Sequence, residues 1–549
     1  MNTVDGIISV PTMTPYFDTF GQLMCVVLRT GTDMSILASI RLGQPGPQVS
    51  LVATPTIGGV PLSVALDASA TTSGEGTLTK FEWDLDFDGV FEADSGTTPT
   101  TNTTINANGV WGLAVRVTNS VGAKSVGSVA VTGVGDWNHT WGTSDVNQFT
   151  SCAFDSGGNI YATGYTRVPG GPLEDDLLLM KWTPTGTLEW AVTWDGGPAD
   201  YGQHIAVDGS GNLIVVGATD VTGDRQILVQ QWTNFGSLIS SKCFGGADYD
   251  NASGMFFDGT DTYIGGTTSS FSLQTDLFAC RVLADGTVDW SQARNHGQDD
   301  YATDVAQMNF IFGPTGLIVL GEAYTTSVPN IWRVEYDLDG TFAGGYDFGT
   351  TANPTRDGQI LYWYDFINSK SHYVLSGERS NGIDSRLFFT DSYGGSSLYG
   401  TLWWNVSAPI VSDMVFDDVG NVVVAGFMPG FDAGSIYGML WRFDSNNGDF
   451  LASEYWNDGL VQARAYHVMP YYGGLLVGGY SPDTAGSWSS LTGNHDTFSD
   501  SWSSADGTGG DLGWSSVDAA GSVTDVSGAG TMDTGAGGDD AWLTRRGTL

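Results

Sequence analysis

The sequence predicts an all-β protein in which a small β-sandwich is followed by one seven-bladed β-propeller. Three observations lead to this prediction. Glycine is abundant, with 77 of the 549 residues, as expected where tight turns join many short strands. Several segments alternate between apolar and polar residues, which is typical of half-buried strands. The second part of the chain also repeats a strand pattern roughly every 50 residues, the size of a propeller blade.

The composition is strongly acidic. The formal net charge is −41, from 61 acidic and 20 basic residues, and 52 of the acidic residues are Asp. A field this negative repels nucleic acid and anionic membrane, so neither is an expected partner. Asp is typical of turns and also binds cations, so Asp-rich turns and calcium sites both fit this composition. No apolar run reaches the roughly 18 residues of a membrane-spanning helix, so membrane insertion is not expected.

The first part of the chain divides into two segments. Residues 1–47 do not share the patterns of the rest of the chain, and we predict an extra strand layer or an attachment segment through which copies of the chain self-assemble. Residues 48–133 alternate as strands of a short β-sandwich do, for example at Leu62, Val64 and Leu66.

Four short segments in residues 48–133 resemble a known family. They are residues 59–62, 67–69, 81–89 and 115–122. On these segments the region resembles a PKD domain. The resemblance implies an immunoglobulin-like fold and a role as an exterior spacer or adhesion module. The family's usual His-Tyr pair is missing, since residues 104–109 read Thr-Ile-Asn-Ala-Asn-Gly.

One loop of this region has the alternating carboxylates of a calcium loop. Asp84, Asp86 and Asp88 are followed by a glycine, and Glu92 offers a further oxygen ligand. An EF-hand would have Glu at the twelfth position, where this chain has Ser95, and the flanking residues are predicted strands. The four acidic residues are therefore predicted either to bind calcium or to cap backbone amides in a turn.

Residues 136–549 contain an internal repeat. A strand that ends in glycine recurs seven times, at residues 160–164, 213–217, 262–266, 317–321, 373–377, 422–426 and 475–479. Turns rich in Asp, Gly and Asn precede several of these strands. The repeats resemble the bacterial β-propeller repeat family of the SBBP type, and this resemblance implies seven blades.

The two ends of the repeat region complement each other. Residues 540–549 stop in the middle of a repeat, and residues 136–142 have the pattern of the missing strand. We therefore predict that residues 136–142 complete the last blade and close the ring, which hides a strand edge. Residues 485–538 form a Gly/Ser/Asp-rich insertion in this blade, and are predicted to be either a surface excursion or a contact loop.

Acidic and aromatic residues recur near the starts of successive repeats. They suggest either a turn structure repeated in each blade or a sugar or cation site on one face of the propeller. The residues of this predicted propeller-face site are Asp200, Tyr201, Tyr249, Asp250, Asp300, Tyr301 and Asp413.

No catalytic motif is found. The six histidines are scattered without a zinc-binding pattern, and no nucleophile elbow or phosphate-binding loop is present. No catalytic residue is therefore predicted. The four cysteines have no metal-binding spacing and are predicted to be buried, with a Cys243–Cys280 disulfide left open.

These observations predict a non-catalytic exterior protein. It would be structural or adhesive, binding a protein or glycan partner or building a surface appendage, with calcium as its one predicted cofactor. The alternative is a carbohydrate-active enzyme that uses Asp residues of the propeller face. The first residues lack the pattern of a cleaved signal peptide. The expected location is extracellular or at the cell surface, or alternatively in a virion tail or fibre.

Overall fold

The computed structural model describes residues 46–549 with gaps, and the backbone of three strands within residues 1–45. The gaps are residues 143–145, 168–173, 221–222, 311–312, 325–328, 349–354, 357, 366–369, 380–383, 392–397, 405–409, 430–435, 446–449, 458–462, 482–486, 490–493, 498–501, 505–507, 512–515, 519–521, 526–530, 533–539 and 548–549. For many strand residues in 363–409 and 487–532 the backbone alone is described. All regular secondary structure in the described residues is β. None of these residues belongs to a helix with the length and apolar content needed to span a bilayer.

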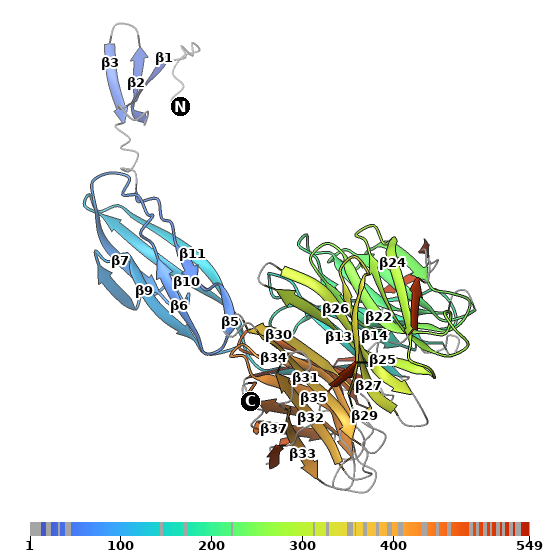
Figure 1. Ribbon diagram of the computed structural model, residues 1–549. Helices are drawn as coiled ribbons and strands as arrows, with labels where there is room; N and C mark the ends of the chain where they lie inside the picture. The colour runs from blue at the N-terminus through green and yellow to red at the C-terminus, as the bar shows by residue number, and fades with distance from the viewer. Residues whose placement is uncertain are drawn as a thin grey trace. The chain divides into compact units, whose positions relative to one another are not determined.

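The chain divides into two compact units, Met1–Val134 and Gly135–Leu549 (Figure 1). In the first unit, the backbone of one antiparallel sheet consists of β1 (Thr12–Phe17), β2 (Leu23–Thr30) and β3 (Asp33–Ala38). Two further sheets form a sandwich. One has the order β5 (Ile57–Gly59), β11 (Lys124–Val134), β10 (Gly109–Asn119), β7 (Leu78–Asp84) and β8 (Ala93–Gly96), and the other β4 (Val52–Thr54), β6 (Leu62–Asp67) and β9 (Thr100–Ile105).

The sandwich core follows from the alternation in the sequence. Along β6 the residues Leu62, Val64 and Leu66 are buried, and the residues between them are exposed. Val64 and Leu66 of one sheet therefore join Trp83 and Val115 of the other in a single hydrophobic cluster. Burial of this apolar surface from both sheets is what holds the sandwich together.

The second unit is built from antiparallel sheets in which strands consecutive in the chain lie side by side (Figure 1). The first four of these sheets contain, in order, β13 (Asn147–Phe154), β14 (Ile160–Thr166), β15 (Asp176–Trp182) and β16 (Leu188–Asp195); β17 (Asp200–Val207), β18 (Leu213–Thr219), β19 (Gln226–Trp232) and β20 (Leu238–Phe244); β21 (Asp250–Phe257), β22 (Thr262–Thr268), β23 (Asp276–Val282) and β24 (Val288–Asn295); and β25 (Asp300–Phe310), β26 (Gly313–Tyr324), β27 (Pro329–Asp337) and β28 (Phe342–Phe348).

The remaining sheets of this unit are also built from consecutive strands, except that β12 (Trp137–Gly142), from the start of the unit, joins the last sheet. They contain β29 (Thr355–Arg356) and β30 (Ile360–Asp365), which both pair with β31 (Lys370–Arg379), then β32 (Asp384–Asp391) and β33 (Leu398–Trp404); β34 (Ile410–Phe416), β35 (Val422–Pro429), β36 (Ile436–Phe443) and β37 (Phe450–Asn457); and β38 (Arg464–Tyr471), β39 (Gly474–Ser481), β47 (Asp540–Gly547) and β12 (Trp137–Gly142).

Neighbouring sheets pack face to face, and their first strands meet in a propeller-like arrangement. The first strands contact one another in the cyclic order β13, β17, β21, β25, β30, β34, β38 and again β13. Large side chains fill the space between sheets. Trp194 of β16 and Trp232 of β19, for example, belong to one buried cluster with Val215 of β18. Trp332 and Trp441 are likewise fully buried in clusters of their own, so these tryptophans are packing residues.

The last of these sheets joins the two ends of the repeat region. β12 pairs antiparallel with β47, with Trp137 opposite Arg545 and Trp141 opposite Ala541. The hydroxyl of Thr544 donates to the carbonyl of Trp137 at 2.9 Å, and Arg545 is 2.7 Å from Asp136. Residues 136–142 therefore occupy the strand position that the sequence predicted for them.

The segment between β39 and β47 adds one more strand to the outer edge of each of these sheets. We call the strands β40–β46 the C-terminal belt; short dark-red strands at the margins of the second unit belong to it (Figure 1). Successive strands of the belt pair with sheets that occur progressively earlier in the chain, and the last belt strand pairs with β12. The pairs are β40 (Ser487–Ser489) on β37, β41 (Asn494–Thr497) on β33, β42 (Trp502–Ser504) on β28, β43 (Thr508–Asp511) on β24, β44 (Val517–Asp518) on β20, β45 (Ser522–Asp525) on β16 and β46 (Thr531–Met532) on β12.

Asp-rich turns and buried cysteines account for two features of the composition. The carboxylate of Asp155 accepts hydrogen bonds from the backbone amides of Gly157 and Asn159, and Asp208 and Asp417 hold equivalent turns. The described cysteines, Cys152, Cys243 and Cys280, are all buried and free. The Cys243–Cys280 disulfide left open by the sequence is therefore not formed.

Candidate functional site

The structure explains why glycine stands at the end of the recurring strand. A Cβ atom on Gly164 would lie 1.8 Å from the carbonyl oxygen of Gln148, and one on Gly217 would lie 1.8 Å from that of Tyr201. Real Cβ atoms do not approach so closely, so the facing strand can come this near only where the residue is glycine. At this point the facing strand, which is the first strand of its sheet, contains a β-bulge.

Bulges occur at equivalent places in these first strands. The register shifts at Phe149/Ser151, Gly202/His204, Ala252/Gly254, Ala302/Asp304, Val411/Asp413 and Ala465/His467. Gln359 holds the corresponding position before β30, because its carbonyl accepts a hydrogen bond from the amide of Ser376, the residue before Gly377. A bulge re-aims the side chains next to it.

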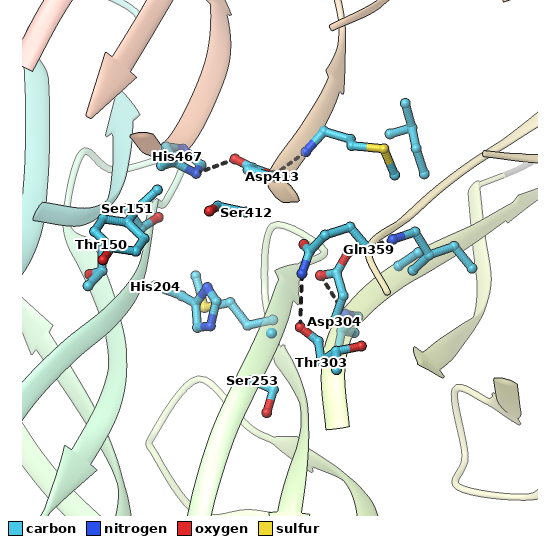
Figure 2. A pocket seen from close by; sticks show the side chains of 18 of the residues that line it. Thr150, Ser151, His204, Ser253, Thr303, Asp304, Gln359, Ser412, Asp413 and His467 are labelled. Atoms are coloured by element: carbon cyan, nitrogen blue, oxygen red, sulfur yellow. Dashed lines mark hydrogen bonds and ion pairs between the residues drawn. The ribbon is translucent and has the colours of Figure 1, made fainter. Parts of the chain in front are cut away.

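The residues that follow the bulges converge on one cavity of about 450 Å³ (Figure 2). Its volume lies within the roughly 300–1,000 Å³ that is usual for small-molecule sites. Hydroxyl, amide, carboxylate and imidazole groups from different sheets face it. Those at the position after the bulge are Ser151, His204, Asp304, Gln359, Asp413 and His467, with Gly254 in the same position, and those at the bulge itself include Thr150, Ser253, Thr303 and Ser412.

Asp304 links two neighbouring sheets. Its carboxylate accepts the backbone N–H of Val305 at 2.7 Å and that of Ile360, in β30, at 2.8 Å. Burial raises the pKa of Asp304 to about 7, with a smaller contribution from the charge of Asp413. The side chain is partly exposed, and the space that it faces is the cavity.

Asp413 of β34 links its sheet to the next one, that of β38, in the same way, and it also has a cationic partner. Its carboxylate accepts the N–H of Met414 at 2.8 Å and that of Val468 at 2.9 Å. The Nδ1 atom of His467 lies 2.7 Å from the same carboxylate, and its Nε2 atom lies 3.1 Å from the carbonyl oxygen of Cys152.

His467 therefore acts as an imidazolium. A carbonyl and an ionised carboxylate can only accept hydrogen bonds, so both ring nitrogens donate. Burial lowers the pKa of His467, but its contacts with Cys152 and Asp413 outweigh this and raise the pKa well above its usual value. His204, across the cavity, is the opposite case. Burial, together with the charge of His467, lowers the pKa of His204 to about 4, so this ring is neutral at pH 7.

The predicted propeller-face site separates into two sets. Asp413 lines the cavity, whereas Asp200, Asp250 and Asp300 lie four residues before the cavity position of their strands and are fully buried. Grouping Asp413 with the other three was wrong, because Asp413 is at the cavity position of its strand and the other three are not. The three carboxylates accept the N–H of Gly196, Gly246 and His296, respectively. Each one thus holds the turn that precedes its own strand.

The three predicted tyrosines also lie outside the cavity lining. Tyr249 and Tyr301 are exposed, and the hydroxyl of Tyr201 donates to Asp175 at 3.1 Å. The guanidinium of Arg225 lies 4.8 Å from the ring centre of Tyr201 and 5.6 Å from that of Tyr249. The rings of Tyr201 and Tyr249 therefore have a cation as their neighbour, whereas the ring of Tyr301 packs edge-on against that of Tyr324.

The cavity residues Asp304, Gln359, His204 and His467 were missed by the sequence analysis. A signal for them exists, because the recurring glycine marks the bulge in the facing strand and hence the residue that faces the centre. Counting 13 residues back from this glycine reaches His204 and Asp413, whereas Asp304 lies 17 and His467 12 residues before it, because the hairpins between the two strands differ in length.

The predicted calcium loop brings its four carboxylates together in the first unit. Asp84, Asp86, Asp88 and Glu92 each offer an oxygen atom, and these atoms lie within 4.8 Å of one another. One oxygen of each carboxylate accepts a backbone N–H of the loop. The Oδ1 atom of Asp84, whose residue is 3% exposed, is buried without a hydrogen-bond partner in the described part of the chain.

Comparison with known proteins assigns neither a family nor a function to this chain. No family model and no curated protein matches this chain. Among solved structures, carbohydrate-binding modules of the β-sandwich superfamily match with 16% identity over 34% of this chain and 78% of that chain, at a TM-score of 0.17. The hemagglutinin-neuraminidase ectodomain of parainfluenza virus 5 matches with 10% identity over 66% of this chain and 85% of that chain, at a TM-score of 0.25. Likenesses this weak carry no argument about function.

Proposed function

We propose that the chain is a non-catalytic binding protein of an exterior surface, in which a PKD-like sandwich precedes a seven-bladed propeller. Its central cavity would hold a small polyhydroxylated group, such as the terminal sugar of a glycan. The observation that carries this proposal is the convergence of hydroxyl, amide and carboxylate groups on a cavity of about 450 Å³. Such groups can both donate to and accept from sugar hydroxyls.

Two further features support binding at an exterior surface. The net charge of −41 keeps the protein soluble and repels anionic surfaces. The C-terminal belt pairs with part of the outer edge of each sheet of the second unit, and it leaves edge strands of only two to four residues, which offer little backbone for edge-to-edge aggregation. The location, whether a cell surface, an extracellular filament or a virion, is part of this proposal.

Binding is favoured over turnover by the backbone contacts of the two carboxylates. Asp304 and Asp413 each accept two backbone N–H groups, one of them from the neighbouring sheet. Both side chains are thus held in place as links between sheets, whereas a general acid or a nucleophile must approach the reacting atoms of its substrate.

The proposal can be tested by blocking the cavity. The wild type would be screened on a glycan array, and hits confirmed as soluble sugars by saturation-transfer NMR. Ser253→Phe places a bulky ring at the cavity wall, and Ser210→Phe is the matched change at an exposed turn. We expect Ser253→Phe to abolish binding and Ser210→Phe to retain it. No glycan bound by the wild type, or equal binding by both variants, contradicts the proposal.

A carbohydrate-active enzyme remains the second candidate. It is favoured by one observation, namely that Asp304, whose pKa is raised by burial to about 7, shares the cavity with the ion-paired Asp413. Glycosidases use a protonated carboxyl group together with an ionised one. Incubating bound glycans with the wild type and with Asp304→Asn decides between the candidates. Recovery of intact glycan supports binding alone, and products made only by the wild type support the enzyme.

We also propose that the loop of Asp84, Asp86, Asp88 and Glu92 binds calcium. Each carboxylate keeps one oxygen free of hydrogen bonds in the described structure, and the free oxygen of Asp84 is buried, which is costly without a cation or another partner. Burial of the loop, and secondarily the charge of Asp88, raises the pKa of Asp86, as expected where carboxylates are crowded.

Calorimetric titration with CaCl₂ tests the calcium site. We expect one site in the wild type, loss of binding in Asp86→Asn, and unchanged binding in Glu75→Gln, which alters an exposed carboxylate elsewhere in the sandwich. Binding that survives Asp86→Asn, or no binding in the wild type, leaves the loop as a capped turn.

A further inference from the structure

Asp304 and Asp413 occupy equivalent positions, yet within the described part of the chain only Asp413 has a counter-ion. Ile360 donates its backbone N–H to Asp304 just as Val468 donates to Asp413. The residue before each donor is therefore equivalent too, and it is Gln359 in one case and His467 in the other. His467 forms an ion pair with Asp413 at 2.7 Å, whereas Gln359 donates through Nε2 to the carbonyl of Thr303 at 3.3 Å and carries no charge.

This difference leaves one carboxylate of the cavity without a charge partner. Among the described side chains, the contacts of Asp304 are the two backbone amides, and none of its neighbours is a cation. The other titratable groups that line the cavity do not replace one, because His204 is neutral at pH 7 and the charge of His467 is matched by Asp413. An ionised carboxylate in such a place gains strongly from an incoming cation.

We infer that the ligand of this cavity carries a protonated amine that pairs with Asp304 where His467 pairs with Asp413. This inference rests on the proposed function and specifies its ligand. The surrounding hydroxyl groups, among them those of Ser253, Thr303 and Ser412, suit the hydroxyls of the same molecule. The combination is that of an amino sugar with a free amine.

A metal ion fits this cavity less well than an amine does. In the described part of the chain, the carboxylates and imidazoles of the cavity do not converge within metal-ligand distance, while those of the loop at Asp84 do. An ammonium group needs only hydrogen-bond acceptors on one side, and a single carboxylate with nearby hydroxyls supplies them.

Three sugars that differ at one substituent test the inference. Binding of D-glucosamine, D-glucose and N-acetyl-D-glucosamine would be measured by calorimetry at pH 7, and the galacto forms in parallel, because the stereochemistry of the ring is a separate question. The three sugars differ in the substituent on carbon 2 of the ring. The amine is positively charged at pH 7, whereas the hydroxyl and the amide are neutral. We expect the amino sugar of one series to bind at least tenfold more tightly than its two neutral analogues.

The matched variant is Gln359→His, which copies the Asp413–His467 pair without altering Asp304. We expect it to remove the preference for the amine while the neutral sugars still bind, and Gln359→Asn, which keeps an uncharged amide, to retain the preference. A neutral sugar that binds as tightly as its amino form overturns the inference and leaves glycan binding intact. A preference unaffected by Gln359→His also overturns it. If no sugar of either series binds the wild type, the inference fails together with the proposed sugar site.

Discussion

Two junctions between sheets have the same backbone arrangement and differ in one side chain. At the junction of β25 with β30, Asp304 accepts the N–H of Ile360, and at that of β34 with β38, Asp413 accepts the N–H of Val468. His467 neutralises the second carboxylate and additionally reaches Cys152 of β13. The comparison teaches that the strand register fixes where a carboxylate lies, and that one residue of the adjoining sheet decides whether it is an internal ion pair or is left for a ligand.

The largest effect is expected when the second junction is converted into the first. His467→Gln leaves Asp413 without its cation, and the side chains of this pair are largely buried, with 22% and 23% exposed. Breaking a buried pair is costly, and partial exposure reduces the cost, so we expect a loss of about 2 kcal/mol in the stability of the second unit. Thermal unfolding measured by near-ultraviolet circular dichroism would show a lower midpoint.

Gln359→Asn is the control for this variant, since it shortens an uncharged side chain at the equivalent position. Its expected cost is about 0.5 kcal/mol, which is typical of a substitution that breaks no buried charge pair. Equal costs for the two variants would show that His467 contributes packing and not charge, and the comparison between the junctions would then lose its basis.

A smaller effect is expected from pH. Because the pKa of Asp304 is raised in the folded protein to about 7, the folded state is favoured while this carboxyl is protonated, and stability is lost as the pH rises through 7. The pKa values of Asp176 and Asp300, raised by burial to about 7, and of Asp200, raised to about 6, act in the same direction. The midpoint temperature of thermal unfolding should therefore decrease as the pH is raised from 5 to 8.

The share of Asp304 can be isolated with Asp304→Asn. This variant removes the titrating group, so its midpoint should fall less steeply with pH than that of the wild type, by an amount equivalent to about 1 kcal/mol between pH 6 and pH 7. Parallel pH profiles for the two proteins would mean that Asp304 does not titrate in this window.

The smallest effect is expected when the first junction is converted into the second. Gln359→His supplies a cation to Asp304, and we expect it to raise the stability of the second unit by about 0.5 kcal/mol at pH 7, since a new pair gains little beyond its desolvation cost. The midpoint of thermal unfolding measures this gain. A lowered midpoint would indicate that the ring of the new histidine does not fit beside Thr303.

The strands of the second unit could be predicted from the sequence because their signals are local. Alternation and the recurring glycine identify the second strand of each repeat, and Asp-rich turns mark where hairpins reverse. The pairing of residues 136–142 with residues 540–547 was also predictable, because each half lacks what the other supplies. Each of these inferences compares segments of the same kind along the chain.

The C-terminal belt was not predicted as strands. Its strands have two to four residues, too few for a pattern of alternation to be recognised. A weak signal is present, since Trp488, Trp502 and Trp514 are each followed by two serines within the insertion. Which edge each short segment pairs with depends on the arrangement of the sheets, and not on the segment itself.

The prediction of which acidic residues occupy equivalent positions in the repeats was also wrong. Asp413 was grouped with Asp200, Asp250 and Asp300 because all four lie near the start of a repeat. A bulge separates the two positions, and it shifts the side chains after it relative to a regular strand. Asp413 therefore shares its position with Asp304, whereas the others hold turns.

The sequence by itself determined that the chain is all-β, that its second part repeats, and that the two ends of the repeat region belong to one sheet. Local backbone preferences and the burial of alternate residues are sufficient for these conclusions. Only the tertiary structure decided that Asp304, Gln359, Asp413 and His467 face one cavity. These residues come from separate repeats, and their side chains meet because the sheets pack around a common centre, which brings equivalent positions together whatever their distance along the chain.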